Sequence, residues 1–270
     1  MTARADFATA FHRLHQGPEV LRLANGWDAG SVRLMESLGA KAVATTSAGV
    51  AWAHGYPDGD ALPLRLLLAT VTDISRAIRV PLTVDMEGGF GETPDAVGES
   101  VAAVIEAGGV GINIEDGSAP PELLAAKIAA AKQAGKRQGI DLFVNARTDV
   151  YLRGLVPEAN RVAETLARAK RYREAGASGI FVPGVVEPAD IRAIAAGTDL
   201  PLNVLAWPGL APAAELAKLG VRRLSAGSGI VEAAWGRAAA LGKAFLAEGR
   251  SDPLSDGALE YGEVNALFAR

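Results

Sequence analysis

Short apolar stretches alternate along the chain with alanine-rich stretches in which charged residues are interspersed. Each apolar stretch is nearly continuous and ends in polar or small residues, a pattern typical of strands in a parallel sheet that is buried on both faces. The alanine-rich stretches, for example 94–107 and 121–138, have the composition of helices. The predicted strands lie within residues 20–25, 41–47, 80–92, 109–117, 141–149, 178–184, 200–206 and 221–227.

Eight strand-and-helix units in a chain of 270 residues predict an α/β fold, a (β/α)8 or TIM barrel. A chain of this length can bury one large core, and no linker or low-complexity tract divides the sequence. We therefore expect a single barrel domain over residues 1–270, in which residues 251–270 form a C-terminal helical extension.

Composition narrows the class of protein. The formal net charge is −4 and the Lys and Arg residues are dispersed, whereas a nucleic-acid surface needs a concentrated basic patch. The sequence lacks the long apolar run of a membrane span and the apolar segment of a signal peptide. We therefore expect a soluble, cytoplasmic protein with no nucleic-acid or membrane partner. The chain has no cysteine, which excludes disulfides and a thiolate nucleophile.

Two carboxylates end the predicted strand within the stretch VPLTVDMEGGFGE. Asp85 and Glu87 are two residues apart, so on an extended strand they point to the same side. Glu115 and Asp116 end the next predicted strand, and Arg147 lies near the end of the one after it. Oxygen ligands of this kind suit Mg²⁺ or Mn²⁺ better than zinc. A solvated acidic turn is the alternative interpretation of one such pair, but the repeated pattern favours a metal site.

In barrel enzymes, the active site lies at the C-terminal ends of the strands. The loop 46–60 lies at this end, whereas His12 and His15 precede the first strand and are expected on the surface of an N-terminal helix. The candidate site residues at the strand ends are Asp85, Glu87, Glu115, Arg147, Asn203 and Ser225.

A series of motifs runs through the predicted barrel: TSAGVA followed by GYPD, then VDMEGGFG, NIEDG, NARTD, FVPG and LNVLAWPG. On these residues the chain resembles the isocitrate lyase and phosphoenolpyruvate mutase superfamily, in particular its short bacterial branch. The resemblance implies a TIM barrel that binds Mg²⁺ and a small 2-oxo acid, such as pyruvate, or its enolate. It also implies that a C–C or C–P bond next to that group is made or broken.

The resemblance implies roles for individual residues. Asp85 would be the direct metal ligand, while Asp58, Glu87 and Glu115 would hold metal-bound waters. Arg147 would clamp a carboxylate or stabilise developing negative charge, and it is the principal catalytic candidate together with Asp58 and Glu115. The turn of Ser47, Ala48 and Gly49 would supply a hydroxyl and backbone N–H groups to a substrate oxygen. The other candidate substrate-binding residues are Thr45, Asp85, Asn203 and Ser225.

The segment after NIEDG departs from the superfamily. In its lyases and mutases a long gating loop follows, whereas here residues 118–121 lead directly into a predicted helix. The general acid of the lyases is carried by that missing loop. Lys127 lies inside the helix and is interpreted as a solvated charge. His54, between Trp52 and Tyr56, is the candidate replacement acid or base, and a loop histidine packed against aromatic residues is the alternative.

The last part of the chain predicts two helices. Residues 228–248 are apolar around most of the helix circumference, so a partner is expected to cover them. A second helix is predicted over residues 256–270, after a polar linker that contains Pro253. The resemblance implies helix swapping, in which a C-terminal helix is exchanged between the subunits of a homodimer or homotetramer. Docking of this helix on its own barrel is the alternative.

Together these features predict a Mg²⁺-dependent carbon–carbon lyase that acts on a small 2-oxo acid or dicarboxylate through a metal-bound enolate. Carbon–phosphorus chemistry on phosphonopyruvate-like substrates is the alternative reaction. Because the gating loop is missing, a non-catalytic protein that binds a 2-oxo acid is the alternative from another class.

Overall fold

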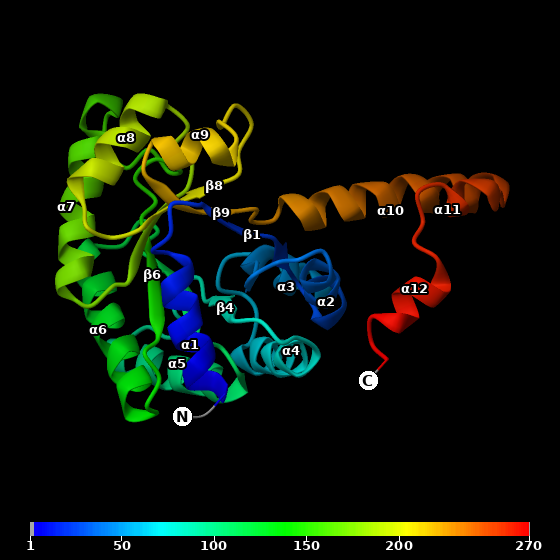
Figure 1. The fold of residues 1–270 in the computed structure, drawn as a ribbon, viewed down its shortest axis with the longest axis horizontal. Coiled ribbons are helices and arrows are strands. Elements are labelled where there is room, and N and C mark those ends of the chain that lie inside the picture. The colour runs from blue at the N-terminus through cyan, green and yellow to red at the C-terminus, as the bar shows by residue number, and fades with distance from the viewer. Residues whose placement is uncertain (1–2, 270) are drawn as a thin grey trace.

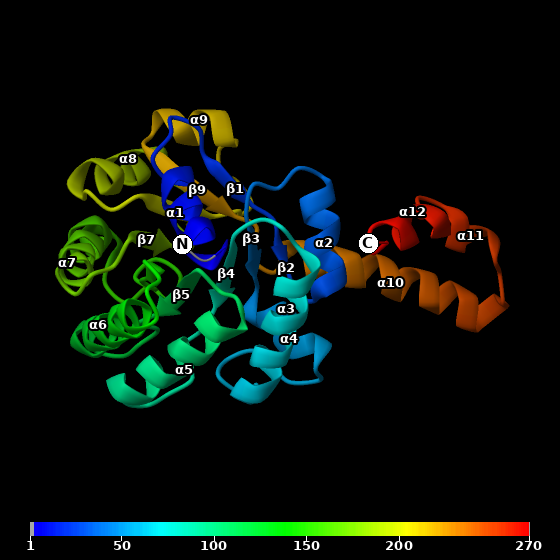
Figure 2. The same ribbon diagram turned by 60° about the horizontal axis from the view of Figure 1, so that its bottom comes forward.

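A computed structural model describes residues 3–269 of the chain. Parallel strands surrounded by helices form the body of the molecule, and a long helical arm extends from it at the C-terminus (Figures 1 and 2). The strands are β1 (Leu21–Leu23), β2 (Asn25–Gly26), β3 (Val43–Thr45), β4 (Leu82–Asp85), β5 (Gly111–Glu115), β6 (Phe143–Arg147), β7 (Gly179–Val182), β8 (Leu202–Leu205) and β9 (Val221–Ser225).

The barrel closes through the first predicted strand, which is split in two. β1 pairs with β9, where Leu23 lies opposite Ser225, and β2 pairs with β3, where Gly26 lies opposite Thr45. The sheet order is β1-β9-β8-β7-β6-β5-β4-β3-β2, and only Ala24 separates its two end strands along the chain. One stretch of backbone therefore joins both ends of the sheet, and the predicted α/β TIM barrel is confirmed.

Helices cover the outside of the barrel with apolar faces that repeat every three or four residues. In α4, for example, Leu67, Val71 and Ile74 are buried against the strands and neighbouring helices. α2 begins with a capping box in which the side chain of Asp28 accepts the N–H of Ser31. The helices of the barrel are α1 (Ala3–Leu14), α2 (Ala29–Ser37), α3 (Ser47–Ala53), α4 (Leu64–Ala77), α5 (Pro94–Ala107), α6 (Pro121–Arg137), α7 (Arg161–Glu174, after a 3-10 turn at Glu158–Asn160), α8 (Pro188–Gly197) and α9 (Ala213–Lys218).

α1 packs against the N-terminal part of β6. Its fully buried Phe11 meets Phe143 edge to face, with 5.2 Å between the ring centroids. His15, just after α1, stacks on Phe143 at 4.0 Å and is only 4% exposed. The prediction that His15 lies on the surface is therefore wrong, because the amphipathic helix folds against the barrel and carries the ring with it. His12 is partly exposed and lies near Asp141.

The C-terminal arm consists of α10 (Gly229–Glu248), α11 (Asp252–Ser255) and α12 (Tyr261–Ala266). α10 projects from the barrel, and the chain turns back so that α12 lies between α10 and the level of α4 in Figure 1. The helix predicted over residues 228–248 is confirmed. A single helix over residues 256–270 is wrong, because Gly257 has φ +67° and residues 256–260 are not helical.

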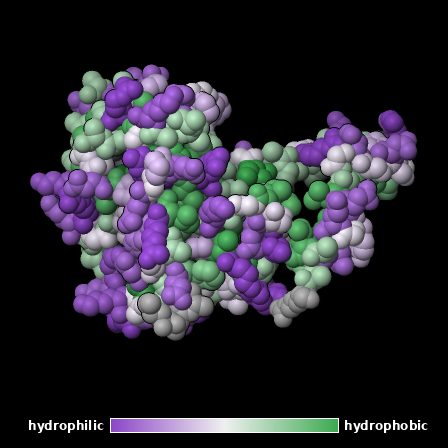
Figure 3. Space-filling view, viewed as in Figure 1, coloured by the Kyte–Doolittle hydropathy of each residue, from purple (hydrophilic) through white to green (hydrophobic). Residues whose placement is uncertain are grey.

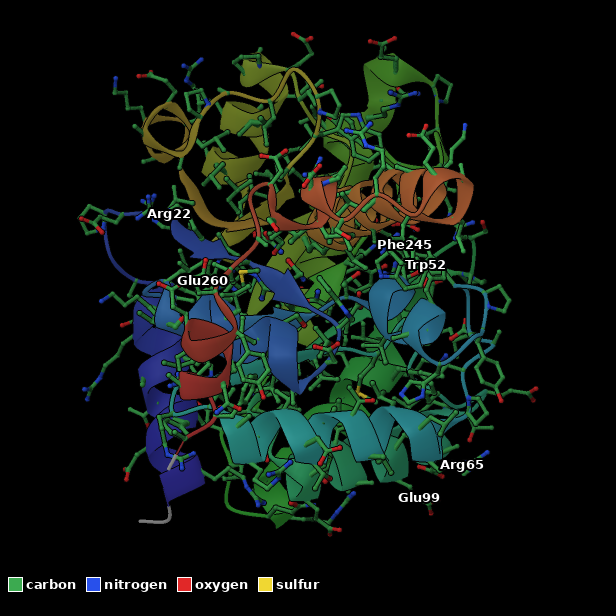
Figure 4. The ribbon with its side chains drawn as sticks, turned by 90° about the vertical axis from the view of Figure 1, so that its right-hand side faces the viewer. Arg22, Trp52, Arg65, Glu99, Phe245 and Glu260 are labelled. Atoms are coloured by element: carbon green, nitrogen blue, oxygen red, sulfur yellow. The ribbon has the colours of Figure 1, made fainter. Side chains whose placement is uncertain are left out.

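The arm exposes apolar side chains. Within α10 the buried residue is Val231, near the base, whereas Leu246 is 87% exposed. Apolar surface is visible where the arm meets the barrel (Figure 3), and Phe245 is labelled on the arm in Figure 4. No described helix, α10 included, combines the length and apolarity that a membrane span requires. The exposed large apolar residues of the arm are Trp235, Phe245, Leu246, Leu254, Leu259, Tyr261, Val264 and Phe268.

Candidate active site

The C-terminal ends of β4, β5 and β6 bring the predicted carboxylates and Arg147 together. Glu115 and Arg147 are opposite each other in the register of β5 and β6. Nη1 of Arg147 lies 2.7 Å from Oε2 of Glu115, forming an ion pair. The charges of Asp85 and Glu87 also act on Glu115, which places all four side chains in one neighbourhood.

Asp85 is positioned by β3 and α3. Its backbone N–H donates to Oγ1 of Thr45 at 2.8 Å, and its carboxylate accepts the backbone N–H of Ser47 at 3.2 Å. Thr45 is fully buried and its hydroxyl accepts from the backbone of β4, so its contact with a substrate stays a prediction. Thr45 and Ser47 thus fix the carboxylate of Asp85.

The turn after Ser47 is the buried start of α3. Ala48 and Gly49 are both buried there, and a Cβ added to Gly49 would lie 3.3 Å from Cγ1 of Val231 in α10. At the other end of α3, Trp52 lies 6.1 Å from Trp235 of α10 between ring centroids. The first N–H groups of a helix have no acceptor within the helix. The backbone N–H groups of Ala48 and Gly49 stay the predicted substrate contacts, and the base of the arm packs against this helix.

Glu87 lies beyond the end of β4 and has φ +48°. The prediction that it shares a strand face with Asp85 is therefore wrong, because the chain turns after Asp85. The carboxylate of Glu87 accepts the backbone N–H of Asp60, and Oδ1 of Asp60 accepts the N–H of Gly88 at 3.3 Å. Asp58 is exposed on the same loop, and its charge acts on both Asp85 and Glu87. Sequence reasoning missed Asp60, whose only signal is the second aspartate of GYPDGD.

Lys127 of α6 contacts the turn that follows Glu87. Its Nζ donates to the carbonyl oxygen of Gly88 at 2.7 Å. Partial burial lowers the pKa of Lys127, and the charge of Asp60 opposes that shift. The interpretation of Lys127 as a solvated charge is wrong, because residues 116–120 form a short connection that brings α6 beside this turn. This short connection occupies the position at which the lyases and mutases of the superfamily carry a long gating loop.

Arg147 is held by carboxylates of the protein itself. Its Nε lies 2.7 Å from Oδ1 of Asp149 and its Nη2 lies 3.2 Å from Oδ2, while Nη1 pairs with Glu115. Burial alone would lower the pKa of Arg147, but Glu115 and Asp149 outweigh it and raise the pKa. Arg147 therefore stays charged, with its planar group fixed at the ends of β5 and β6.

Asp116 joins this cluster to α7. Its carboxylate accepts the backbone N–H of Asp149 at 2.9 Å, Nη1 of Arg168 at 2.8 Å and the hydroxyl of Tyr172 at 2.6 Å. Arg168 and Tyr172 were not predicted, and their spacing of four residues on one helix face is their only sequence signal. The second acid of NIEDG therefore anchors the segment after β6.

Asn203 and Ser225 lie inside the barrel. Both are buried, and the hydroxyl of Ser225 donates to Oδ1 of Asn203 at 3.2 Å. Arg223, fully buried, donates from Nε to Ser225 at 3.1 Å and from Nη2 to Asn113 at 3.2 Å. Burial lowers the pKa of Arg223 to about 9, against the charge of Asp85. Ser225 ends β9 as predicted, whereas Asn203 is the second residue of β8 and not at its end. The substrate-binding role of both residues stays a prediction. Nδ2 of Asn203 has no hydrogen-bond partner within residues 3–269.

His54 is not brought to the carboxylates. It caps the C-terminal end of α3 and is exposed, and its Nε2 lies 2.9 Å from Oγ1 of Thr70 in α4. Thr70 donates its own proton to the carbonyl of Leu66, so it accepts from His54. The ring therefore bonds an outer helix, at the opposite end of α3 from Ser47, and its predicted catalytic role is not supported.

The electrostatics of the carboxylates suit a bound cation. Burial raises the pKa of Asp85, and it raises the pKa of Glu87 to about 7 and that of Glu115 to about 8. Neighbouring carboxylates add to each of these shifts. A divalent cation would offset this cost, and an all-oxygen donor set fits Mg²⁺ or Mn²⁺. Over the described part of the chain, no three His, Cys, Asp or Glu side chains form a direct ligand cluster. Direct ligation by Asp85, with the other carboxylates acting through water, therefore stays a prediction.

Comparison with known proteins gives a consistent picture. An uncharacterised protein of Mycobacterium tuberculosis is 37% identical over 223 residues, which cover 81% of this chain and 82% of that protein. An oxaloacetate decarboxylase of Bradyrhizobium sp. (strain BTAi1) is 30% identical over 197 residues, covering 69% of this chain and 66% of that enzyme. A crystal structure from Burkholderia cenocepacia, provisionally named as a phosphonomutase, is 42% identical with a TM-score of 0.85, covering 89% of this chain and 98% of that one.

The fold extends to more distant enzymes. The structure of a phosphonopyruvate hydrolase in complex with oxalate and Mg²⁺ has a TM-score of 0.85 at 23% identity, covering 97% of this chain and 94% of that one. The model of the phosphoenolpyruvate phosphomutase family matches residues 11–246. The chain therefore belongs to the phosphoenolpyruvate phosphomutase family, within the isocitrate lyase and phosphoenolpyruvate mutase superfamily.

Proposed function

We propose that this chain is a Mg²⁺-dependent lyase that acts on a small 2-oxo acid or dicarboxylate. The observation that carries the proposal is the Arg147–Glu115 ion pair beside Asp85 and Glu87. This pair lies at the end of the barrel where barrel enzymes have their active sites. Fixed positive charge next to a set of oxygen ligands suits a substrate whose oxygen gains negative charge during bond cleavage.

Within this proposal, Asp85 would hold the metal directly, while Asp58, Glu87 and Glu115 would hold it through water. When bound, Mg²⁺ or Mn²⁺ supplies a Lewis acid that stabilises negative charge on a substrate oxygen. Thr45 and Ser47 orient Asp85. Asp149 orients Arg147, whose remaining N–H groups would bind the substrate carboxylate or an enolate oxygen.

The names of the relatives support a small oxo acid as the substrate. The Bradyrhizobium relative is an oxaloacetate decarboxylase, and the phosphonopyruvate hydrolase structure holds oxalate, a dianion of the same carboxylate and oxygen chemistry. Carbon–carbon bond cleavage is the reaction we propose. Carbon–phosphorus chemistry is the second candidate, because a structure at 42% identity carries the provisional phosphonomutase name.

The assembly is also a proposal. Apolar residues along α10 to α12 are exposed in the single chain, which supports a homodimer or homotetramer in which the arm crosses to a neighbour. The base of the arm packs behind Gly49 of α3, so the arm begins next to the candidate site. A cytoplasmic location remains a prediction of the sequence.

An activity panel tests the function. Pyruvate, oxaloacetate, phosphonopyruvate and hydroxy dicarboxylates would be incubated with the full-length protein and Mg²⁺, with product release followed by NMR. Carbon–carbon bond cleavage supports the lyase, and turnover of phosphonopyruvate alone supports the second candidate. Tight binding without any turnover would identify a binding protein instead. This outcome is considered because the missing gating loop carries the general acid of the lyases. Absence of both binding and turnover would overturn the proposal.

A further inference from the structure

The segment after β6 forms a rigid turn at the edge of the candidate site. The backbone N–H of Arg153 donates to the carbonyl of Asp149 at 2.9 Å. The hydroxyl of Tyr151 donates to Asp190 of α8 at 2.8 Å. A Cβ added to Gly184, in the FVPG motif, would lie 3.2 Å from the backbone of Leu152, so the glycine allows this turn to pack closely. The turn that carries Arg153 is therefore held from two sides.

Arg153 and Arg147 share one carboxylate. Nε of Arg153 lies 2.8 Å from Oδ2 of Asp149, and Nη2 of Arg147 lies 3.2 Å from the same oxygen. Asp149 is completely buried, whereas the side chain of Arg153 is 50% exposed. Two guanidinium groups are thus fixed side by side, with Arg147 on the side of Glu115 and Arg153 on the side of solvent.

The outer end of Arg153 is open to a ligand. Its ion pair with Asp149 uses Nε, and no described hydrogen bond or ion pair within residues 3–269 uses its Nη1 or Nη2. The two Nη groups can therefore donate to both oxygens of one carboxylate, while the bond from Nε to Asp149 keeps the guanidinium oriented. Arg147, by contrast, already places Nε, Nη1 and Nη2 on Asp149 and Glu115.

We propose that Arg153 binds the second carboxylate of a dicarboxylate substrate, whose 2-oxo acid end lies at Arg147. The inference rests on the proposed function and narrows its substrate class from a small 2-oxo acid or dicarboxylate to a 2-oxo dicarboxylate. A monocarboxylate of the same length would reach Arg147 but leave the Nη groups of Arg153 without a carboxylate. Specificity would then come from a charge pair that only the dicarboxylate completes.

Matched pairs of ligands distinguish binding at Arg147 from binding at Arg153. Oxaloacetate and 2-oxobutyrate each have four carbons, and 2-oxoglutarate and 2-oxopentanoate each have five, so each pair differs by a carboxylate in place of a methyl group. Dissociation constants would be measured by calorimetry in the presence of Mg²⁺ for the wild type, Arg153→Met and Arg153→Lys. The control is Arg173→Met, because Arg173 forms a half-exposed ion pair with Asp199 at 2.6 Å on the outer helix α7.

Arg153→Met should weaken binding of the dicarboxylate about tenfold or more and change binding of its monocarboxylate partner less than about twofold. Arg153→Lys, which keeps the charge, should fall between wild type and Arg153→Met. Equal weakening of both ligands would show that Arg153 only positions Asp149, and unchanged binding would show no role; either result overturns the inference. A wild type that prefers the monocarboxylates also overturns it, while the proposed function stands. A wild type that binds none of the four acids overturns the proposed function itself.

Discussion

Glu115 and Arg147 face each other across β5 and β6 and join their side chains at 2.7 Å, at the end of the barrel where both strands stop. Strand register alone fixes this pair, because opposite residues of adjacent parallel strands are neighbours. Asp149 then takes the other edge of the Arg147 guanidinium. Arg147 is therefore a bridge between two buried or half-buried carboxylates as well as the proposed substrate contact.

Replacement of Arg147 by lysine should reduce kcat/KM by about 100-fold, or ~2.7 kcal/mol, because an ammonium cannot bond Glu115, Asp149 and a ligand at fixed angles. Steady-state kinetics on the best substrate of the panel would measure the change. Arg173→Lys is the matched control, since Arg173 pairs with Asp199 away from the strand ends. Equal activity in Arg147→Lys and Arg173→Lys would remove Arg147 from the mechanism.

Lys127→Met should weaken Mg²⁺ binding about tenfold, because the charged hydrogen bond to Gly88 holds the turn that carries Glu87. Calorimetric titration with Mg²⁺ would measure this. The control is Lys132→Met on the same helix, which also loses an ammonium-to-carbonyl bond, to Leu142 at 2.8 Å, but far from Glu87. If both variants bind Mg²⁺ as the wild type does, Lys127 serves only the packing of α6.

The sequence was sufficient for the barrel and for most of the cluster, and the reasons are physical. Apolar strands ending in Asp85, Glu115 and Arg147 could be recognised because a barrel places all strand ends on one rim. The contacts of long side chains on the outer helices could not be predicted in this way. Whether Lys127 reaches Gly88 or solvent depends on the angle at which α6 packs, which local pattern does not encode.

Two other differences have the same origin. His15 is polar and lies at a helix end, yet α1 packs it on Phe143, a contact between residues far apart in sequence. Asn203 was expected at the rim because its strand ends there, but it is the second residue of β8 and points into a buried polar layer with Ser225. Depth along a strand depends on barrel stagger, which a single sequence does not specify.

His15 should make the protein less stable in acid. Burial, followed by the charge of Arg223, lowers its pKa from 6.5 to about 3. Its Nδ1 lies 2.8 Å from the carbonyl of Phe11, which can only accept, so Nδ1 carries the proton and Nε2 has no partner within residues 3–269. Because the folded pKa is depressed, the unfolded chain binds the extra proton between these two values. The contribution of neutral His15 to the free energy of unfolding is complete above pH 6.5 and is lost as pH falls toward 3.

Urea unfolding at several pH values would measure this loss, which should reach up to about 4 kcal/mol for His15 across the window. The comparison is His15→Asn, whose amide can still donate to the carbonyl of Phe11 but does not titrate. Carboxylates with raised pKa values act in the opposite direction in both proteins, so the difference between the two curves isolates His15. Parallel curves would show that His15 does not cause acid sensitivity.

The exposed arm should hold the oligomer together. Leu246→Asp places a charge on an apolar residue that is 87% exposed in the single chain, and it should lower the molar mass measured by light scattering. Leu38→Asp is the control, since Leu38 is 75% exposed on the barrel and should leave the mass unchanged. A wild type of monomer mass, or a Leu246→Asp variant of unchanged mass, would contradict the proposed exchange of the arm.

We expect a cation held by Asp85 to bind the oxo acid end of the ligand. The most direct test of this expectation is calorimetric titration of oxalate, a stable mimic of the enolate, into the wild type and Asp85→Asn, each with Mg²⁺ and with EDTA. The wild type should bind oxalate saturably with Mg²⁺, and this binding should weaken at least about 100-fold in EDTA and in Asp85→Asn. Oxalate binding that is equally tight in EDTA, or equally tight without the Asp85 carboxylate, would contradict this expectation.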